Sequence, residues 1–353
     1  MSKFKKVLIQ TGKAVSLNEV ARQIGYVLEQ RGIVTHLNRH TPTLPYYNEF
    51  VDAVIFVYPC APAWCIQWFY HYVKAKRELN GRAVYYTTIE GIPKRQMIPD
   101  WVYRDVEFIA NSNYTKQCLR KVGLPVIDVI PHGVLEIEIK QANELSEKYE
   151  KLIRSEFKDK VIFGFVGDMN FRKGWDKLLK AIEMLRERTK EFQVLFITKK
   201  EILKYIQNIP STSLVSEFGI RSHVEIMGFL KAIDFLVFPS HAEGFGLPVL
   251  EANAVGTPAI ICNLPVFREY ADLNSNVVFD YVDVQYFDNQ DGVMYEMYMY
   301  KVEDLKSALE YAIDIKKNYP SMYEEMKVKV SEKVKNFRSE NLYVKFINYL
   351  NLS

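Results

Sequence analysis

Two glutamates eight residues apart, Glu243 and Glu251, flank a turn that contains Gly244 and Gly246. The turn follows an apolar run and opens an expected helix. Its glycines let a ligand approach the backbone, and the helix start offers N–H groups to an anion. Open α/β sheets bind ligands at the carboxyl ends of their strands, so we expect both carboxylates to face one ligand site there. The alternative is a glycine-rich turn with two solvated glutamates.

A basic pair, Arg172-Lys173, lies in a second loop of this kind. It follows the apolar run Val161–Val166 and precedes Gly174 and a helical pattern at Trp175–Thr189. A guanidinium presents a planar fork to phosphate oxygens, and an ammonium group is a compact point charge. The pair at a helix start therefore indicates a phosphate site. The alternative is an exposed basic pair that binds nothing.

Short β-branched runs alternate with amphipathic stretches along both halves of the chain. This alternation predicts an α/β protein with two parallel sheets in tandem, each covered by helices. The strands expected in the first half are Lys6–Gln10, Ile33–Leu37, Ala53–Tyr58, Ala83–Thr88, Glu107–Asn111 and Val126–Ile130. Those expected in the second half are Val161–Val166, Gln193–Ile197, Val224–Met227, Phe235–Pro239 and Pro258–Cys262.

The expected domain limits follow the break in this alternation. Residues 1–135 form the first domain, 136–160 a linker or surface helix, 161–335 the second domain and 336–353 a C-terminal helix. In that tail Val344, Ile347 and Leu350 recur at helical spacing, so one face must be covered, and we expect it to pack on the first domain.

The segment Gly228–Ile233 conflicts with this scheme. It is all that separates the expected strands Val224–Met227 and Phe235–Pro239. A parallel crossover needs about a dozen residues or more. Either the two strands are not neighbours, or a crossover helix is missing from the chain at this point.

Length and composition exclude several classes of protein. The 353 residues (41.3 kDa) suit two domains, and 48% hydrophobic with 25% charged residues excludes bulk disorder. No apolar run approaches the roughly 18–20 residues of a membrane-spanning helix, and Val7–Ile9 is too short for a signal-peptide core. The four cysteines show no metal-ligand spacing, so we expect reduced thiols in a cytoplasmic protein.

Charge is distributed unevenly. Residues 1–135 contain 17 Lys and Arg against 10 Asp and Glu, whereas the remainder contains 29 against 33. A basic first half favours an anionic partner such as a phosphorylated ligand or a lipid surface, and the alternative is a chance bias on a solvated surface. No nucleic-acid recognition module is present in the sequence, so nucleic acid is not an expected partner.

Together the two loops resemble the donor-binding signature of the retaining glycosyltransferases of family 4, glycosyl transferases group 1. Weaker similarity extends over Phe108–Gly133 and Val161–Leu179, and the resemblance covers roughly residues 105–315. It implies the GT-B fold, which has two facing Rossmann-like domains with parallel sheets and a C-terminal helix returning to the first domain. The first domain would bind the acceptor and the second a nucleotide sugar.

The resemblance also implies roles for single residues. Glu251 would hydrogen-bond the donor ribose, Glu243 would contact the transferred sugar, and Arg172 and Lys173 would neutralise the diphosphate leaving group. Stabilising that charge is the largest catalytic contribution available, and two cations supply it without a metal. The sequence has no Asp-x-Asp, and neither a metal nor a cofactor is expected. Further donor-binding residues are Gly167, Phe245, Gly246 and Leu247.

The sequence departs from the family pattern at several positions. Asp168 follows Gly167 where an arginine is frequent, and it would repel phosphate unless it points away. Gly12 and Lys13 replace a Gly-Gly pair, so Gly12 would admit a close backbone approach and Lys13 would add a phosphate contact. Glu90 stands where a histidine is frequent, and it is the candidate to hydrogen-bond the sugar or receive the acceptor proton.

The sequence thus predicts a metal-independent glycosyltransferase that moves a hexose from a UDP- or GDP-linked sugar, with retention, to a glycan, lipid or protein. Peripheral membrane contact through the basic first domain is a further expectation. The alternatives are a catalytically inactive nucleotide-sugar-binding protein, a nucleotide-sugar epimerase or a sugar phosphorylase of the same fold. His132 is expected to be a turn residue rather than a catalytic base.

Overall fold

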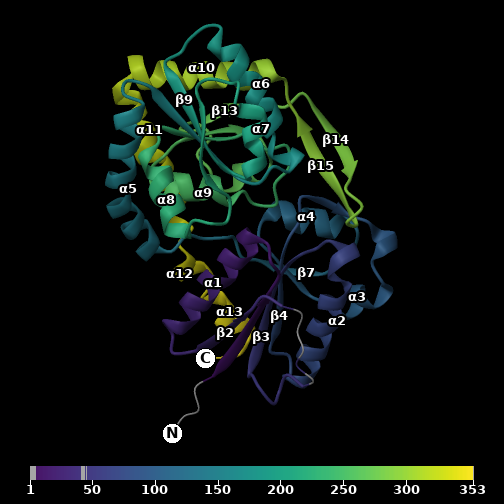
Figure 1. The fold of residues 1–353 in the computed structure, drawn as a ribbon. Coiled ribbons are helices and arrows are strands. Elements are labelled where there is room, and N and C mark those ends of the chain that lie inside the picture. Colours follow the sequence, from purple (N-terminus) through teal and green to yellow (C-terminus); the bar gives the residue numbers. More distant parts are fainter. Residues whose placement is uncertain (1–4, 41–43, 45, 353) are drawn as a thin grey trace. The chain divides into compact units, whose positions relative to one another are not determined.

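A computed structural model describes residues 5–40, 44 and 46–352 of the chain (Figure 1). The chain divides into two compact units. The first comprises residues 1–135, 286–296 and 337–353, and the second comprises residues 136–285 and 297–336. Within the described residues each unit is built around a six-stranded sheet whose paired strands run parallel. The predicted α/β fold with two parallel sheets is therefore confirmed.

The sheet of the first unit has the strand order β2-β1-β3-β4-β6-β7. Its strands are β1 (Lys6–Thr11), β2 (Val34–Asn38), β3 (Ala53–Pro59), β4 (Ala83–Thr88), β6 (Phe108–Ala110) and β7 (Val126–Val129). The central strand β3 is buried from Ala53 to Tyr58, as expected for a strand covered on both faces. Because the strands are parallel, the loops after β1 and β4 emerge at the same edge, on either side of β3.

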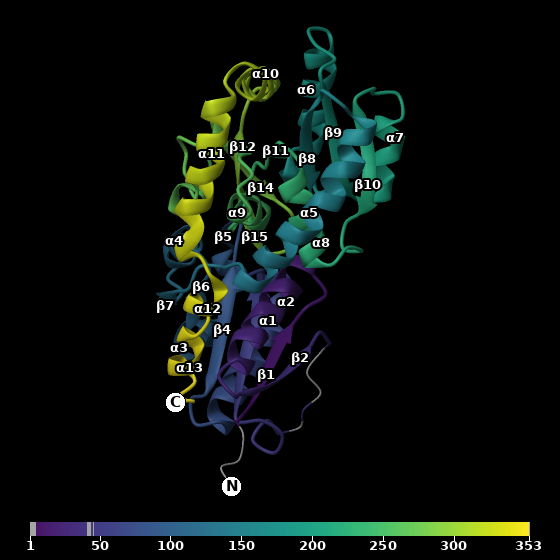
Figure 2. The same cartoon turned by 90° about the vertical axis from the view of Figure 1, so that its left-hand side faces the viewer.

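Helices of the first unit come from both ends of the chain. They include α1 (Val15–Glu29), α2 (Pro62–Glu78), α3 (Asp100–Asp105), α4 (Asn113–Lys121), α12 (Ser339–Leu342) and α13 (Lys345–Tyr349), with the 3₁₀ turn η1 (Arg95–Met97). Figure 2 shows α12 and α13 beside α1 and β4, which they contact.

The C-terminal helix returns to the first unit, as the sequence predicts, but with a different face inward. Its buried residues are Tyr343, Phe346 and Leu350, whereas Val344 and Ile347 are only partly buried. The Tyr343 hydroxyl also accepts a hydrogen bond from the N–H of Gly133 (3.2 Å). The larger aromatic side chains occupy the interior because they bury more apolar area than Val344 or Ile347 would.

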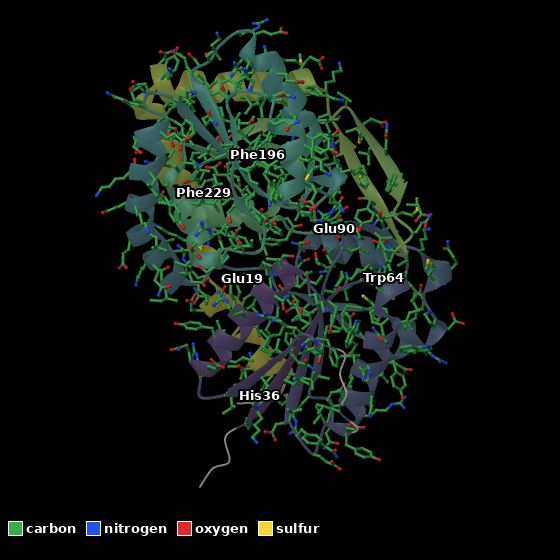
Figure 3. All side chains as sticks on the ribbon, in the orientation of Figure 1. Glu19, His36, Trp64, Glu90, Phe196 and Phe229 are labelled. Atoms are coloured by element: carbon green, nitrogen blue, oxygen red, sulfur yellow. The ribbon has the colours of Figure 1, made fainter. Side chains whose placement is uncertain are left out.

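The sheet of the second unit has the order β10-β9-β8-β11-β12-β13. Its strands are β8 (Val161–Val166), β9 (Phe192–Thr198), β10 (Thr212–Glu217), β11 (Phe235–Phe238), β12 (Ala259–Cys262) and β13 (Val277–Phe279). Phe196 of β9 lies in the interior and is fully buried (Figure 3). The helices include α5 (Glu136–Glu156), α6 (Trp175–Arg186), α7 (Leu203–Ile206), α8 (His223–Ala232), α9 (Leu247–Ala254), α10 (Val302–Asn318) and α11 (Pro320–Lys333). The 3₁₀ turns are η2 (Phe171–Lys173), η3 (Lys200–Ile202), η4 (Phe267–Glu269) and η5 (Val334–Asn336).

The strand predicted at Val224–Met227 is wrong, because these residues lie in helix α8. Ser222 caps the helix: its hydroxyl accepts a hydrogen bond from the N–H of Glu225 (3.3 Å), whose carboxylate accepts one from the N–H of Ser222 (2.9 Å). This capping box starts a helix in spite of the β-branched residues that follow it. Residues 218–234 thus connect β10 to β11 through α8, and no crossover helix is missing.

A second difference is a three-stranded sheet in the order β14-β15-β5, none of which was predicted. The strands are β5 (Gly91–Pro93), β14 (Asp283–Asp288) and β15 (Val293–Met299). β15 runs antiparallel to β5, with Met294 opposite Ile92, which brings residues 293–295 into the first unit. Among the described residues, no helix is both long and apolar enough to cross a membrane.

Candidate functional site

The basic pair Arg172-Lys173 forms the turn η2 between β8 and α6. Asn170 precedes the turn, and its side-chain oxygen accepts a hydrogen bond from the N–H of Arg172 (3.1 Å). Gly174 ends the turn with φ of +66°, and a Cβ atom there would lie 2.2 Å from the carbonyl oxygen of Pro239. Only glycine fits this position, so the local sequence fixes the pair at the start of a helix, as predicted.

Both cations meet the carboxylate of Glu243, which lies in the loop after β11. Lys173 Nζ is 2.6 Å from Glu243 Oε1, and Arg172 Nη1 is 3.4 Å from Oε2. Arg172 also donates a hydrogen bond to the carbonyl oxygen of Ala242 (3.0 Å). Because β8 and β11 are neighbours in the sheet, their two loops lie side by side at its carboxyl edge. The exposed fractions of the Arg172, Lys173 and Glu243 side chains are 18%, 13% and 6%.

Glu243 remains ionised in this environment. Burial alone would raise the pKa of its carboxyl, but the charges of Lys173 and Arg172 outweigh burial and hold the pKa below its usual range. Burial lowers the pKa of the Lys173 ammonium group, and the neighbouring charge of Glu243 opposes that effect. With Lys173 charged, two cations around one carboxylate give the cluster of Arg172, Lys173 and Glu243 a net positive charge. Such a cluster can hold an anionic ligand.

The glycine turn beside the cluster is closely packed. Gly246 immediately precedes α9 with φ of +88°, and a Cβ atom there would lie 2.5 Å from the ring of Phe267. The Tyr270 hydroxyl donates a hydrogen bond to the carbonyl oxygen of Gly246 (2.8 Å), and the Tyr270 ring stacks on that of Phe245 at 4.8 Å. The Phe245 side chain is therefore part of the core, which leaves its backbone as the part that can reach a ligand.

The loop after β8 contains Gly167 and the unexpected Asp168. The N–H of Gly167 donates to the carbonyl oxygen of Ile197 (3.1 Å) and so extends the pairing of β8 with β9. Asp168 Oδ1 accepts a hydrogen bond from the N–H of Asn170 (3.1 Å). The Asp168 carboxylate is thus engaged by its own loop and stabilises the turn that presents the basic pair.

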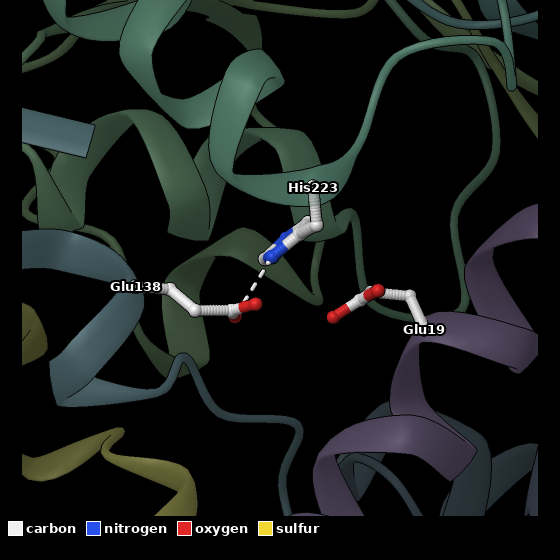
Figure 4. A group of neighbouring side chains, drawn as sticks. All are labelled: Glu19, Glu138 and His223. Atoms are coloured by element: carbon white, nitrogen blue, oxygen red, sulfur yellow. Dashed lines mark hydrogen bonds and ion pairs between the residues drawn. The ribbon is translucent and has the colours of Figure 1, made fainter. Parts of the chain in front are cut away.

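Glu251 lies one turn into α9 and contacts a histidine. His223 Nε2, at the start of α8, is 3.0 Å from Glu251 Oε1. The other ring nitrogen of His223, Nδ1, is 2.9 Å from Glu138 Oε2 near the start of α5 (Figure 4). Three helices of the second unit therefore place one imidazole between two carboxylates.

The remaining predicted site residues belong to the first unit. Gly12 and Lys13 directly follow β1, and Glu90 lies between β4 and β5, so all three occupy the carboxyl edge of the first sheet. The main-chain oxygen of Glu90 accepts a hydrogen bond from the N–H of Glu296 (3.3 Å). A Cβ atom on Gly12 would lie 3.4 Å from the Tyr58 ring, an ordinary contact, so packing does not require glycine there.

His132 is a neutral structural residue. Asn111 Nδ2 lies 3.1 Å from its Nε2, and the Tyr86 hydroxyl lies 2.9 Å from its Nδ1 while donating to the carbonyl oxygen of Ile130 (2.6 Å). Burial lowers the pKa of His132 to about 3, so the ring is uncharged at neutral pH. A ring with this pKa and these partners agrees with the predicted turn residue rather than with a base.

The structure brings Arg172, Lys173 and Glu243 into one cluster and places Glu251 on the helix that the same loop opens. Sequence reasoning missed His223, which contacts Glu251, and Glu138, which contacts His223. The spacing of Ser222 and Glu225 could have revealed the helix that begins at His223. No sequence signal pairs residues 138 and 223, because that contact depends on how α5, α8 and α9 pack.

Comparisons with known proteins agree with this arrangement. The family described as glycosyl transferases group 1 matches residues 137–325. Uncharacterized glycosyltransferase 335 of Sulfolobus islandicus rod-shaped virus 1 is 28% identical over 349 residues, which cover 97% of this chain and 99% of the viral protein.

Two solved structures are similar in fold. A glycosyltransferase from Rickettsia africae has a TM-score of 0.68 and 17% identity, with 99% of this chain and 100% of that chain covered. The Anabaena protein HepE, in complex with UDP and glucose, has a TM-score of 0.67 and 13% identity, with the same coverage. These likenesses confirm the GT-B fold with its two Rossmann-like domains. The match over more than half of its length shows that the chain belongs to the glycosyl transferases group 1 family.

Proposed function

We propose that the chain transfers a hexose from a nucleoside-diphosphate sugar to an acceptor, with retention of anomeric configuration and without a metal ion. The observation that carries this proposal is the cluster of Arg172, Lys173 and Glu243 at the carboxyl edge of the second sheet. Its net positive charge suits a diphosphate. Retention and the hexose rest on the resemblance of the two loops to family 4.

Lys173 and Arg172 stabilise the leaving group in this proposal. Negative charge accumulates on the diphosphate as the sugar–phosphate bond breaks, and preorganised donors at that point lower the barrier. An ammonium group has three N–H donors, so Lys173 can keep its contact with Glu243 while it binds a phosphate oxygen. Glu243, ionised and able only to accept hydrogen bonds, would take them from hydroxyls of the transferred sugar.

The nucleoside part of the donor would bind along α9. Glu251 would accept hydrogen bonds from the ribose hydroxyls, and the N–H groups at the start of α9 would meet the diphosphate. Backbone contacts are proposed for Gly167, Phe245, Gly246 and Leu247. From the first unit we propose that Gly12 and Lys13 contact the donor phosphate and that Glu90 contacts the sugar or receives the acceptor proton.

Neither a metal nor a cofactor is required by this scheme. The two cations and the helix start together supply the charge that a divalent ion would otherwise supply. The sequence also has no Asp-x-Asp, the usual pair of carboxylates for holding such an ion near a diphosphate. Uridine and guanosine remain the two donor bases proposed.

The acceptor side includes a surface suited to peripheral membrane contact. Ile66, Tyr70 and Arg77 share one exposed face of α2, and Tyr70 is 61% exposed. Trp64, at the start of the same helix, is 69% exposed on the surface (Figure 3). Aromatic and basic side chains together suit the headgroup region of an anionic bilayer. Sedimentation with anionic lipid vesicles tests this contact, and protein that remains in the supernatant contradicts it.

A cytoplasmic location is part of the proposal. All four cysteines are free and buried, which agrees with a reducing compartment. The proposal therefore places the reaction where reduced thiols persist.

The experiment incubates the purified chain with UDP-, GDP- and ADP-linked hexoses in excess chelator and measures release of nucleoside diphosphate. Slow hydrolysis of one donor, with the released sugar keeping its anomeric configuration by NMR, is expected. Tight binding of a donor without turnover with any acceptor would instead indicate an inactive binding protein. Interconversion of donor sugars without release of nucleoside diphosphate would indicate an epimerase.

A further inference from the structure

The second unit contains a histidine held between two carboxylates. His223 Nδ1 lies 2.9 Å from Glu138 Oε2, and its Nε2 lies 3.0 Å from Glu251 Oε1. The three side chains are largely buried, with exposed fractions of 10% for His223, 6% for Glu138 and 7% for Glu251. Figure 4 shows the imidazole directed at Glu138, with the hydrogen bond between them.

We propose that His223 is a positioning residue, which holds the Glu251 carboxylate in the orientation that binds the ribose of the donor nucleotide. This inference rests on the proposed function, in which Glu251 contacts the ribose. A glutamate side chain has several rotatable bonds, and fixing one carboxylate oxygen in advance reduces the entropy lost when the ligand binds. Glu138 acts one step further away, because it fixes the ring of His223 from the opposite side.

The donor and acceptor groups of this cluster favour a directed arrangement. A neutral imidazole has one N–H group, and an ionised carboxylate can only accept hydrogen bonds. Both contacts of His223 are therefore hydrogen bonds when its ring carries two protons.

A purely structural role explains this cluster less well. Buried ion pairs stabilise a fold little, because the desolvation of the charges offsets their attraction. Apolar side chains at the junction of α5, α8 and α9 would hold the helices together at least as well. The arrangement does something that apolar residues cannot: it fixes the direction of the Glu251 carboxylate.

Two substitutions of His223 distinguish the roles of its two ring nitrogens, because each keeps one donor and removes the other. In His223→Gln the side-chain amide nitrogen takes the place of Nε2 and keeps a donor to Glu251. In His223→Asn the amide nitrogen takes the place of Nδ1 and keeps a donor only to Glu138. The probes are UDP and GDP, and the measurement is the dissociation constant by calorimetry together with KM and kcat for the donor sugar.

We expect His223→Asn to weaken binding of the nucleoside diphosphate about tenfold, the loss of one charge-assisted hydrogen bond. His223→Gln, which loses only the contact with Glu138, is expected to weaken binding less than His223→Asn does. The donor KM should follow the dissociation constant, while kcat changes less, because the ribose lies away from the reacting bond. Equal affinities for the Asn and Gln variants, with equally lowered melting temperatures, would show a structural role and overturn the inference.

Glu138→Ala gives a second route if the His223→Asn variant does not fold. It releases the ring on the side away from Glu251, and we expect weaker nucleotide binding with Glu251 itself intact. Unchanged affinity in this variant overturns the inference. Loss of affinity in Glu251→Ala without loss in any His223 or Glu138 variant overturns only this inference. Absence of nucleotide binding by the wild type overturns the proposed function and this inference with it.

Discussion

His132 in the first unit has neutral hydrogen-bond partners, whereas His223 in the second unit lies between charged ones. His132 contacts a tyrosine hydroxyl and an asparagine amide, and burial holds its pKa at about 3. His223 instead lies between the carboxylates of Glu138 and Glu251. These two histidines thus have opposite electrostatic surroundings.

The difference extends to the carboxyl edge of each sheet. In the second unit, Arg172 and Lys173 surround an ionised and buried Glu243. In the first unit the corresponding loops contain Gly12, Lys13 and Glu90, of which Lys13 is exposed and Glu90 is half-buried. Buried charges that are already in place suit a ligand with a fixed anionic group, so the comparison supports the proposal that the donor diphosphate binds to the second unit.

The largest expected effect comes from Lys173→Ala. Removing one preorganised donor to a developing charge costs about 2.7–4 kcal/mol, so we expect kcat to fall roughly a hundred- to thousandfold. The variant also leaves Glu243 buried with one cation fewer. This should destabilise the second unit by less than the roughly 3–5 kcal/mol that an unpaired buried charge costs, because Arg172 still contacts Glu243. Nucleoside diphosphate release and thermal unfolding measure the two effects.

Lys329→Ala is the matched control for this variant. Lys329 also contacts a carboxylate, Glu325 at 2.5 Å, but on an exposed face of α11, with side chains 53% and 61% exposed. We expect no change in turnover or melting temperature from this substitution. A control variant as impaired as Lys173→Ala would contradict the difference drawn between buried and exposed charges.

Glu251→Ala should affect binding rather than chemistry. The ribose hydroxyls lose a charged acceptor worth about 1.5–3 kcal/mol, so the dissociation constant of the nucleoside diphosphate should rise roughly ten- to a hundredfold. Calorimetry measures it, and Glu324→Ala on α11 is the control for removing a carboxylate. An unchanged affinity in a folded Glu251→Ala protein would remove this residue from the donor site.

His132 should make the first unit sensitive to acid. Its pKa falls from 6.5 in the unfolded chain to about 3 when buried, so the unfolded state binds more protons between these values. The free energy of unfolding therefore does not depend on the protonation of His132 above pH 6.5. It decreases as the pH falls toward 3, by at most about 1.4 kcal/mol per pH unit. Urea unfolding between pH 7.5 and 5 checks this expectation. If His132→Gln keeps the same slope, other groups are responsible.

The smallest expected effects come from a glycine-to-alanine substitution made once in each unit. Gly246→Ala places a Cβ at φ of +88° and 2.5 Å from Phe267, so we expect a loss of about 1–3 kcal/mol in stability. Gly12→Ala makes only an ordinary contact with Tyr58 at 3.4 Å, and its melting temperature should stay near that of the wild type. Differential scanning calorimetry of both variants measures these effects. Equal losses would contradict the contrast in packing.

Much of the fold follows from the sequence because long buried strands and amphipathic helices leave a local pattern. The misassigned helix α8 shows the limit of that pattern. The β-branched Val224 and Ile226 favoured a strand in the prediction, but the capping box of Ser222 and Glu225 starts a helix in the structure. The strands β5 and β15 have no local signal, because residues 91–93 pair with residues about 200 positions away.

The residues of the candidate site could be predicted from the sequence, but the contacts between them could not. The loop with Arg172 and Lys173 and the loop with Glu243 each have a recognisable start of a helix. Their contact depends on β8 and β11 being neighbours, which strand order decides. The packing of α5, α8 and α9 likewise determines the contacts of His223. Such contacts arise from tertiary structure and leave no spacing in the sequence.

We propose that the charged cluster of the second unit, and not a metal ion, neutralises the diphosphate leaving group. The most direct measurement is donor turnover by the wild type and by Lys173→Ala, each with excess chelator and with added Mg²⁺. The wild type is expected to keep its full rate in chelator, and Lys173→Ala to remain impaired under both conditions. Loss of wild-type activity in chelator, with Lys173→Ala close to the wild-type rate in Mg²⁺, would contradict the account.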